Sequence, residues 1–298
     1  MTHAGSSQAT GSLASNPIPG PTPRSPATPA PTPDQLQARI AAGERVSTRA
    51  EMSQEYFDDL VNLMTMQADS ELAGGFGYVP WIQRAPGVEE KLIVANIVRD
   101  ETRHAKAVYG LLRDLGIDVD SRVEQHDFNY RIAQENIGTD RVGTDARVNI
   151  FYYPIETWAD FVTFNFLMDR GAGHQLEDGL VCSYVPWANE LQRIFKEELT
   201  HIRHGDMWVE RLAKDPATHD EIQAAVTKWF SRVMNIFGRP GTRRNERYRY
   251  YGLKKRDNDG VRAAFVAEVK ANCDAWGLTL PDWTPDWQQA DTQERFGA

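Results

Sequence analysis

The chain has 298 residues, of which 41% are hydrophobic and 25% charged, a composition typical of an ordinary globular protein. Its 42 acidic residues outnumber its 33 lysines and arginines. The resulting net charge of -9 argues against general nucleic-acid binding, which needs a basic face. No run of about 18 apolar residues occurs, so the sequence predicts no membrane span. Because the two cysteines, Cys182 and Cys273, form no CxxC motif, we expect a reducing, cytoplasmic location.

The first 34 residues consist mainly of Ser, Thr, Ala, Gly and Pro, with few large apolar side chains. Such a segment cannot bury enough surface to offset the entropy lost on ordering, so we predict a disordered tail. The expected organisation is a tail at 1–34, one domain at 35–288 and a short C-terminal tail at 289–298.

Four long helices of functional interest are predicted after the tail, because apolar residues recur every three or four positions and strand-like alternation is nearly absent. They span residues 53–74, 87–116, 154–180 and 186–214. Ser53 is expected to cap the first helix, and the pair Gly74–Gly75 is expected to end it. The sequence therefore predicts an all-α fold.

Polar side chains interrupt the apolar stripe of each helix. The six residues concerned are Glu71, Glu101, His104, Asp169, Glu198 and His201. Burial of an ionised carboxylate is prohibitive unless the group is paired or bound to a metal, and no lysine or arginine recurs on these stripes. Four carboxylates would balance two divalent cations. For any single acid, partial exposure or a salt bridge is the alternative.

The pattern Glu-x-x-His occurs twice, at Glu101–His104 and Glu198–His201. Residues three apart share one face of a helix, so each pair can offer one ion a nitrogen and a bridging carboxylate. With one acid from each of the other two helices, this is the dinuclear arrangement of ferritin-like bundles. The 68-residue separation of Glu101 and Asp169 leaves room for a crossover. We therefore predict a ferritin-like four-helix bundle with a long crossover and additional helices.

Each Glu-x-x-His is preceded by a further acid, Asp100 or Glu197. Metal-bound histidines usually donate their second N–H to a carboxylate, so each acid is expected to reach the histidine of the facing helix. An ordinary solvated acid is the alternative. His204 leaves the apolar stripe and ranks below His201 as a ligand, and His174 is interpreted as a pocket or packing residue.

From roughly residue 50 to 288 the chain resembles the catalytic subunits of the bacterial phenylacetyl-CoA epoxidase (ring-1,2-epoxidase) family. The resemblance is carried by SELAGGFGYVPWIQRAP, RDETRHAKAVYGLLRDLG, FYYPIETWADFVTFNFLMDRGAG, KEELTHIRHG, NIFGRP and WGLTLPD. It implies a ferritin-like di-iron monooxygenase that activates O₂ and inserts one oxygen atom into the aromatic ring of an acyl-CoA. Its metal ligands would be the six residues above, with Glu71, Glu101, Asp169 and Glu198 as the catalytic carboxylates.

The resemblance also implies partners: a structural subunit, small accessory subunits and a flavin/iron–sulfur reductase. Coenzyme A is expected only as part of the substrate. Manganese is an alternative to iron, because such sites accept both metals. The chain departs from the family pattern in its Pro-rich N-terminus and in Arg170 and His174 beside Asp169, two changes that could reshape the pocket.

A basic stretch at 238–256 stands out in this acidic chain. Arginine and lysine suit the phosphates of coenzyme A, so the stretch is a candidate contact for CoA phosphates or for a partner. The candidate residues for this role are Arg243, Arg244, Arg247, Lys254 and Lys255. A solvated loop paired with neighbouring acids is the alternative.

Two other functions stay open from the sequence. The chain could be another ferritin-like di-metal oxidase, or a structural subunit of such a complex without chemistry of its own. Related scaffold subunits tend to lack the ligands, whereas all six are present here.

Overall fold

The computed structural model describes residues 29–133, 137–138 and 143–285. Within these ranges the chain is helical and contains no strand, only an isolated bridge between Val46 and Tyr184. The all-α prediction is therefore confirmed. None of the described helices is long and apolar enough to cross a bilayer.

The predicted tails lie mostly outside the described residues. The first helix begins at Pro33 with a capping box from Thr32, so the last two residues assigned to the 1–34 tail are helical, which corrects that boundary. Residues 1–28 and the 289–298 tail are not among those described, and their predicted disorder stays a prediction.

The helices follow one another with few long interruptions. In chain order they are α1 (Pro33–Ala41), η1 (Arg49–Glu51), α2 (Gln54–Arg84), α3 (Gly87–Asp114), α4 (Val119–Gln125), η2 (Asn149–Tyr152), α5 (Trp158–Phe164), η3 (Asn165–Asp169), α6 (Arg170–Gly179), α7 (Val185–Lys214), α8 (His219–Val233), η4 (Met234–Phe237), α9 (Arg243–Tyr250) and α10 (Asn258–Trp276).

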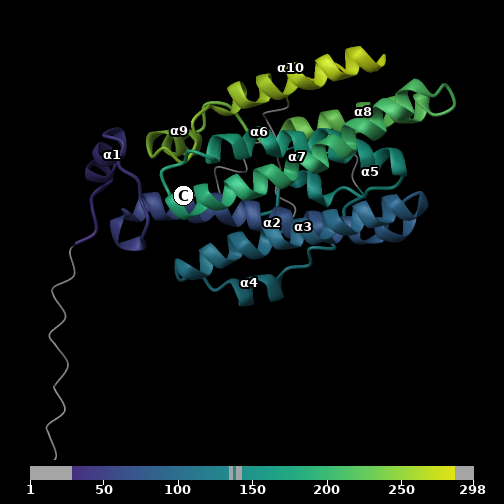
Figure 1. The fold of residues 1–298 in the computed structure, drawn as a ribbon. Helices are drawn as coiled ribbons and strands as arrows, with labels where there is room; N and C mark the ends of the chain where they lie inside the picture. Colours follow the sequence, from purple (N-terminus) through teal and green to yellow (C-terminus); the bar gives the residue numbers. More distant parts are fainter. Residues whose placement is uncertain (1–28, 134–136, 139–142, 286–298) are drawn as a thin grey trace, which may run out of the picture.

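Four long segments form the bundle: α2, α3, the α5–η3–α6 segment and α7. The α2–α3 pair packs tightly along its length, and α7 contacts both α3 and the α5–η3–α6 segment. Figure 1 shows the two pairs side by side, with α8 and α10 farther out beyond the second pair. The crossover between α3 and α5 carries α4 and η2. This is the predicted ferritin-like bundle with a long crossover and additional helices.

Helix α2 does not end at Gly74–Gly75 as predicted but continues to Arg84 through Pro80. The two glycines have a packing role instead. A Cβ at Gly75 would lie 3.3 Å from the Cβ of Glu101 and one at Gly74 would lie 3.0 Å from the ring of Phe151. The absence of side chains lets α2 approach α3 closely at the level of Glu101.

The third predicted helix, 154–180, is shorter and irregular. It begins at Trp158, because Thr157 and Asp160 form a capping box that fixes the start. Residues Asn165–Asp169 then form a π-helical segment before α6 continues. Gly205 of α7 faces this segment so closely that a Cβ would meet the backbone nitrogen of Phe166 at 2.3 Å. The close approach of α7 and the π-helical segment sets the position of Asp169.

The buried apolar side chains form two clusters at opposite ends of the bundle. Ile97 and Trp208 belong to one cluster, and Ala105 and Ile194 belong to the other. Helices α3 and α7 each pass from one cluster to the other, and their Glu-x-x-His pairs lie at the junction. The polar site thus occupies the boundary between two apolar cores.

Candidate metal centre

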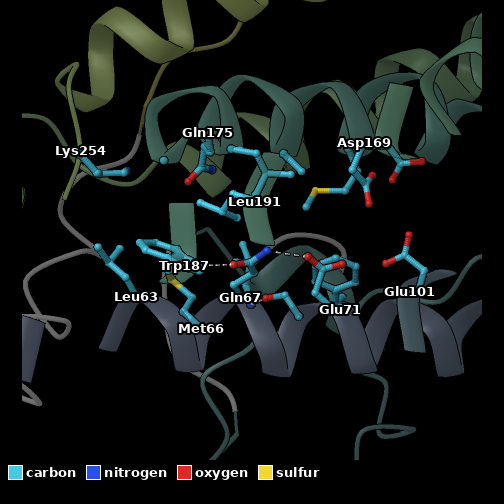
Figure 2. Close-up of a pocket in the computed structure, with 18 of the residues that line it drawn as sticks. Leu63, Met66, Gln67, Glu71, Glu101, Asp169, Gln175, Trp187, Leu191 and Lys254 are labelled. Atoms are coloured by element: carbon cyan, nitrogen blue, oxygen red, sulfur yellow. Dashed lines mark hydrogen bonds between the residues drawn. The ribbon is translucent and has the colours of Figure 1, made fainter. Parts of the chain in front are cut away.

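All six polar residues predicted from the stripes converge at this junction. Their ligand atoms form two groups: Glu71, Glu101, His104 and Glu198 in one, and Asp169, Glu198 and His201 in the other. Within each group these atoms lie within 4.8 Å of one another. Figure 2 shows Glu71 from α2, Glu101 from α3 and Asp169 from η3 pointing toward a common space.

Glu198 belongs to both groups, and its two oxygens face different histidines. Oε1 lies 3.1 Å from Nδ1 of His104, and Oε2 lies 3.4 Å from Nδ1 of His201. Nδ1 of His201 is also 3.2 Å from Oε1 of Glu101. Two atoms that each lie about 2.1 Å from one ion are separated by about 3.0–3.4 Å in octahedral or tetrahedral geometry. The spacing therefore fits two ions with Glu198 between them.

Four buried atoms of the candidate ligands have no hydrogen-bond partner, and three of them face the centre: Nδ1 of His104, Nδ1 of His201 and Oε1 of Glu198; the fourth, Nε2 of His201, points toward Asp100. Such unpaired buried groups are rare and call for an explanation. Among the described residues, no lysine or arginine lies within 4.0 Å of any of the four acids. Cations held between these atoms would satisfy all three, so the residues present fit a dinuclear metal site.

The pKa values reflect charges confined in an apolar interior. Burial, followed by the charge of Glu198, raises the pKa of Glu101 and of Asp169 well above their usual range. Burial alone would lower the pKa of His104, but the carboxylates of Glu198 and Glu71 raise it to about 11. Without metal, the cluster therefore retains protons, and metal ions would take their place.

The two outer acids lie beside the histidines of the facing helices. Oε2 of Glu197 is 2.7 Å from Nε2 of His104, whereas Oδ2 of Asp100 is 3.7 Å from Nε2 of His201, beyond hydrogen-bond length. Arg103 contacts both acids, at 2.9 Å from Asp100 and 2.8 Å from Glu197. This arginine, which the sequence reasoning missed, links the two outer carboxylates.

Asp169 has two hydrogen-bond donors that the sequence analysis also missed. The Tyr78 hydroxyl donates to Oδ1 at 3.4 Å, and the Asn165 amide donates to Oδ2 at 3.0 Å. Asn165 in turn contacts His204 at 3.3 Å, and Nε2 of His204 lies 2.9 Å from Glu90. His204 is in neither metal group, in keeping with its lower rank. Tyr78 was missed because α2 was expected to end before it.

A cavity of about 110 Å³ extends from the carboxylates between α2, α6 and α7. Its wall is mainly apolar, with contributions from Leu63, Met66, Val148, Phe151, Met168, Trp187 and Leu191. The Trp187 indole donates to Gln67 at 2.8 Å, and the Gln67 amide donates to Glu71 at 3.0 Å (Figure 2). The cavity therefore has a direct hydrogen-bonded connection to one candidate ligand.

Arg170 and His174 are not among the residues that line this cavity. Arg170 pairs with Asp206 at 2.7 Å and with Glu268 at 2.8 Å, and His174 contacts Glu268 at 2.8 Å. These interactions tie α6 to α7 and α10. Neither residue therefore reshapes the pocket through direct contact with it.

The residues of the basic stretch lie in different environments. Arg247 forms two bonds to Asp59, with the shorter at 2.7 Å, so its charge is already neutralised. Arg243 and Lys255 are exposed, and Arg244 is half-buried. Lys254 instead lines the cavity. Arg247 and Lys254 therefore differ in environment from the other three residues, and a contact of the stretch with CoA phosphates or a partner stays a prediction.

Comparisons with known proteins show which family the chain belongs to. A family model described as "Phenylacetic acid catabolic protein" matches residues 36–298. The chain is also 26% identical over 275 residues to a subunit of the 1,2-phenylacetyl-CoA epoxidase of Escherichia coli (strain K12), covering 89% of this chain and 82% of that relative. The match to the family model spans most of the chain, which therefore belongs to the family of phenylacetic acid catabolic proteins.

Proposed function

We propose that the chain is the oxygen-activating subunit of a multicomponent monooxygenase that epoxidises the aromatic ring of an acyl-CoA such as phenylacetyl-CoA. The observation that carries this proposal is the buried cluster of four carboxylates and two histidines opening onto an apolar cavity. The similar protein from Escherichia coli belongs to an enzyme named for this reaction. A purely structural subunit would have no need of three unpaired atoms buried beside one another.

In this proposal the six residues hold two iron ions, with manganese as the alternative metal. When bound, the two ions would supply electrons for the reduction of dioxygen. Glu197 orients the imidazole of His104, and Tyr78 and Asn165 hold the carboxylate of Asp169. The apolar wall of the cavity excludes water and places the ring beside the carboxylates.

The overall reaction needs an external reductant. One double bond of the ring, O₂, two electrons and two protons give the epoxide and one water molecule. Two cysteines are too few to hold a four-cysteine iron–sulfur cluster. We infer a separate flavin/iron–sulfur reductase, together with structural and accessory subunits, in a cytoplasmic complex.

The proposal is tested by reconstituting the Fe(II)-loaded complex with its reductase, NADPH, ¹⁸O₂ and phenylacetyl-CoA. Mass spectrometry should detect one ¹⁸O atom in the acyl-CoA product. The double variant Glu101→Ala, Glu198→Ala should give none while still assembling with its partners. Consumption of O₂ with unchanged thioester would instead favour an oxidase that acts on another substrate.

A further inference from the structure

A row of hydrogen bonds leads from Asp169 away from the metal centre to the start of α3. The Asn165 amide donates to Oδ2 of Asp169 at 3.0 Å, and Oδ1 of Asn165 lies 3.3 Å from Nδ1 of His204. Nε2 of His204 lies 2.9 Å from Oε2 of Glu90. Asn165, His204 and Glu90 come from η3, α7 and α3, and none of the three belongs to either metal group. The orientation of Asp169 therefore depends on contacts among three elements.

The two inner members of this network are buried and sterically confined. Asn165 is fully buried, and only 4% of the His204 side chain is exposed. The imidazole meets the rings of Trp158 and Phe161 nearly edge-on, with ring centroids 6.2 and 6.3 Å away. The next residue, Gly205, lets α7 approach the π-helical segment closely at this level. The imidazole is thus held in one place beside the Asn165 amide.

The hydrogen-bond partners determine how this amide is oriented. The oxygens of a metal-bound aspartate can only accept, so the NH₂ group of Asn165 must face Asp169 and its carbonyl oxygen must face His204. Nδ1 of His204 must then carry a proton. The contact between Nε2 and Glu90 needs a further proton, because two unprotonated acceptors would repel each other. Without the imidazole, the buried amide could turn its oxygen toward Asp169.

Asp169 belongs to only one of the two metal groups. That group contains Glu198 and His201, whereas the other contains His104 in place of His201. The outer acid Glu197 contacts His104 at 2.7 Å, so its support goes to the group without Asp169. The two candidate sites therefore share Glu198 but have separate outer networks.

We propose that His204 is a positioning residue, which keeps the amide of Asn165 turned toward Asp169 and so strengthens one of the two metal sites. The site concerned is the one that contains Asp169. Glu90 supports it indirectly, by fixing the imidazole from the other side. The inference rests on the dinuclear centre of the proposed function and is independent of the substrate. Loss of this network should make two similar sites unequal.

The test uses variants that break the network at successive positions. Asn165→Leu removes the donor to Asp169, and His204→Phe keeps a ring but removes both nitrogens. His204→Gln restores an amide that can donate to Asn165. Glu90→Ala removes the outermost partner, and Glu89→Ala is its matched control, because both acids lie in the first turn of α3 and Glu89 is exposed.

Binding of Mn(II) is measured without any turnover. Isothermal titration gives the affinity of each ion, and electron paramagnetic resonance distinguishes a lone Mn(II) from a coupled pair. Melting temperatures of the metal-free proteins report whether each variant is folded. Because Glu90 lies at the edge of the network, its variant keeps the test decisive if a buried substitution prevents folding.

We expect the parent chain and Glu89→Ala to bind two Mn(II) ions as a coupled pair. Asn165→Leu and His204→Phe should weaken one site by about 10–100-fold, the usual effect of losing an outer partner of a ligand, and leave the other nearly unchanged. The signal of a lone ion should then appear. Glu90→Ala should give a smaller loss at the same site, and His204→Gln should recover part of the affinity.

An equal loss at both sites would indicate a general structural role, and unchanged affinities would remove His204 from metal positioning. Either result overturns this inference while leaving the proposed function in place. A folded parent chain that binds no second ion would overturn the dinuclear centre and this inference together.

Discussion

Glu197 shows how a residue outside the metal groups can still control them. Its carboxylate accepts from His104 and is itself held by Arg103, so the imidazole is fixed with Nδ1 facing Glu198. The Glu-x-x-His spacing predicted the inner residues. The same motif also pointed to the acid that precedes each glutamate. Glu197 of α7 lies beside His104 of α3, and Asp100 of α3 lies beside His201 of α7. Arg103 could not be predicted, since its pairing depends on the relative position of α3 and α7.

We expect Glu197→Ala to weaken iron binding by about 10–100-fold, the usual effect of removing the acceptor behind a metal-bound histidine. Isothermal titration with Mn(II), or anaerobic titration with Fe(II), measures the affinity. Glu210→Ala is the matched control, because Glu210 is on the same helix and pairs only with the exposed Lys214 in the described residues. Equal affinities for the two variants would contradict a positioning role for Glu197.

The stability of the metal-free chain should fall as the pH rises from about 5 to about 9. The folded state holds protons on Glu101 and Asp169 that the unfolded chain releases, because burial raises both pKa values. His104 contributes to the free energy of unfolding with the same sign. Its contribution is complete below the ordinary histidine pKa of 6.5 and is lost as the pH rises through its raised pKa of about 11. The pKa of Glu198 is lowered to about 2, so this residue changes the stability only at pH values below its ordinary pKa of 4.5.

Urea unfolding of chelator-treated protein at several pH values measures this dependence. Saturation with Mn(II) should weaken or reverse it, because the metals replace the retained protons. Glu101→Gln should reduce the slope by removing one titrating group. A metal-free chain that becomes more stable toward pH 9 would contradict the account of the buried acids.

At the scale of the element, the π-helical segment Asn165–Asp169 decides where the third helix presents its acid. The sequence predicted a continuous helix, because apolar periodicity does not distinguish one wider turn from the α-helical repeat. Gly74 and Gly75 were misread for a related reason. A glycine pair is typical of a helix end, but here Gly75 allows close packing against α3 and Gly74 against the ring of Phe151, which only the tertiary structure reveals.

Gly205→Ala should destabilise the protein by about 1–3 kcal/mol, because the added Cβ meets the backbone of the π-helical segment. It should also weaken metal binding by displacing Asp169. Gly110→Ala provides the contrast: this glycine lies inside α3 with nothing within 4 Å of an added Cβ, so alanine should stabilise the helix by about 0.5–1 kcal/mol. Denaturant unfolding of both variants tests the pair, and similar effects would contradict the packing argument.

At the scale of the whole molecule, the metal centre joins two apolar cores that the four bundle helices share. The sequence predicted the helices and their polar faces because periodicity is a local property. It did not predict that Lys254 turns into the cavity or that Arg247 pairs with Asp59, which is 188 residues away. Both outcomes depend on how α9 packs against α2, for which the chain carries no local pattern.

Metal binding should therefore stabilise the whole bundle. At a free metal concentration 100 times the dissociation constant, each site adds about 2.7 kcal/mol to the free energy of unfolding. We expect differential scanning calorimetry to show one melting transition that rises with added Mn(II) and falls with a chelator. Melting temperatures that do not respond to metal in the parent chain would contradict this role of the centre.

The most direct test of the central claim is the metal content of the chain after anaerobic Fe(II) loading and removal of unbound iron. Elemental analysis should give close to two irons per chain in the parent and almost none in the Glu101→Ala, Glu198→Ala variant, with both proteins folded. A folded parent chain that retains no iron under these conditions would contradict the dinuclear site and favour a purely structural role.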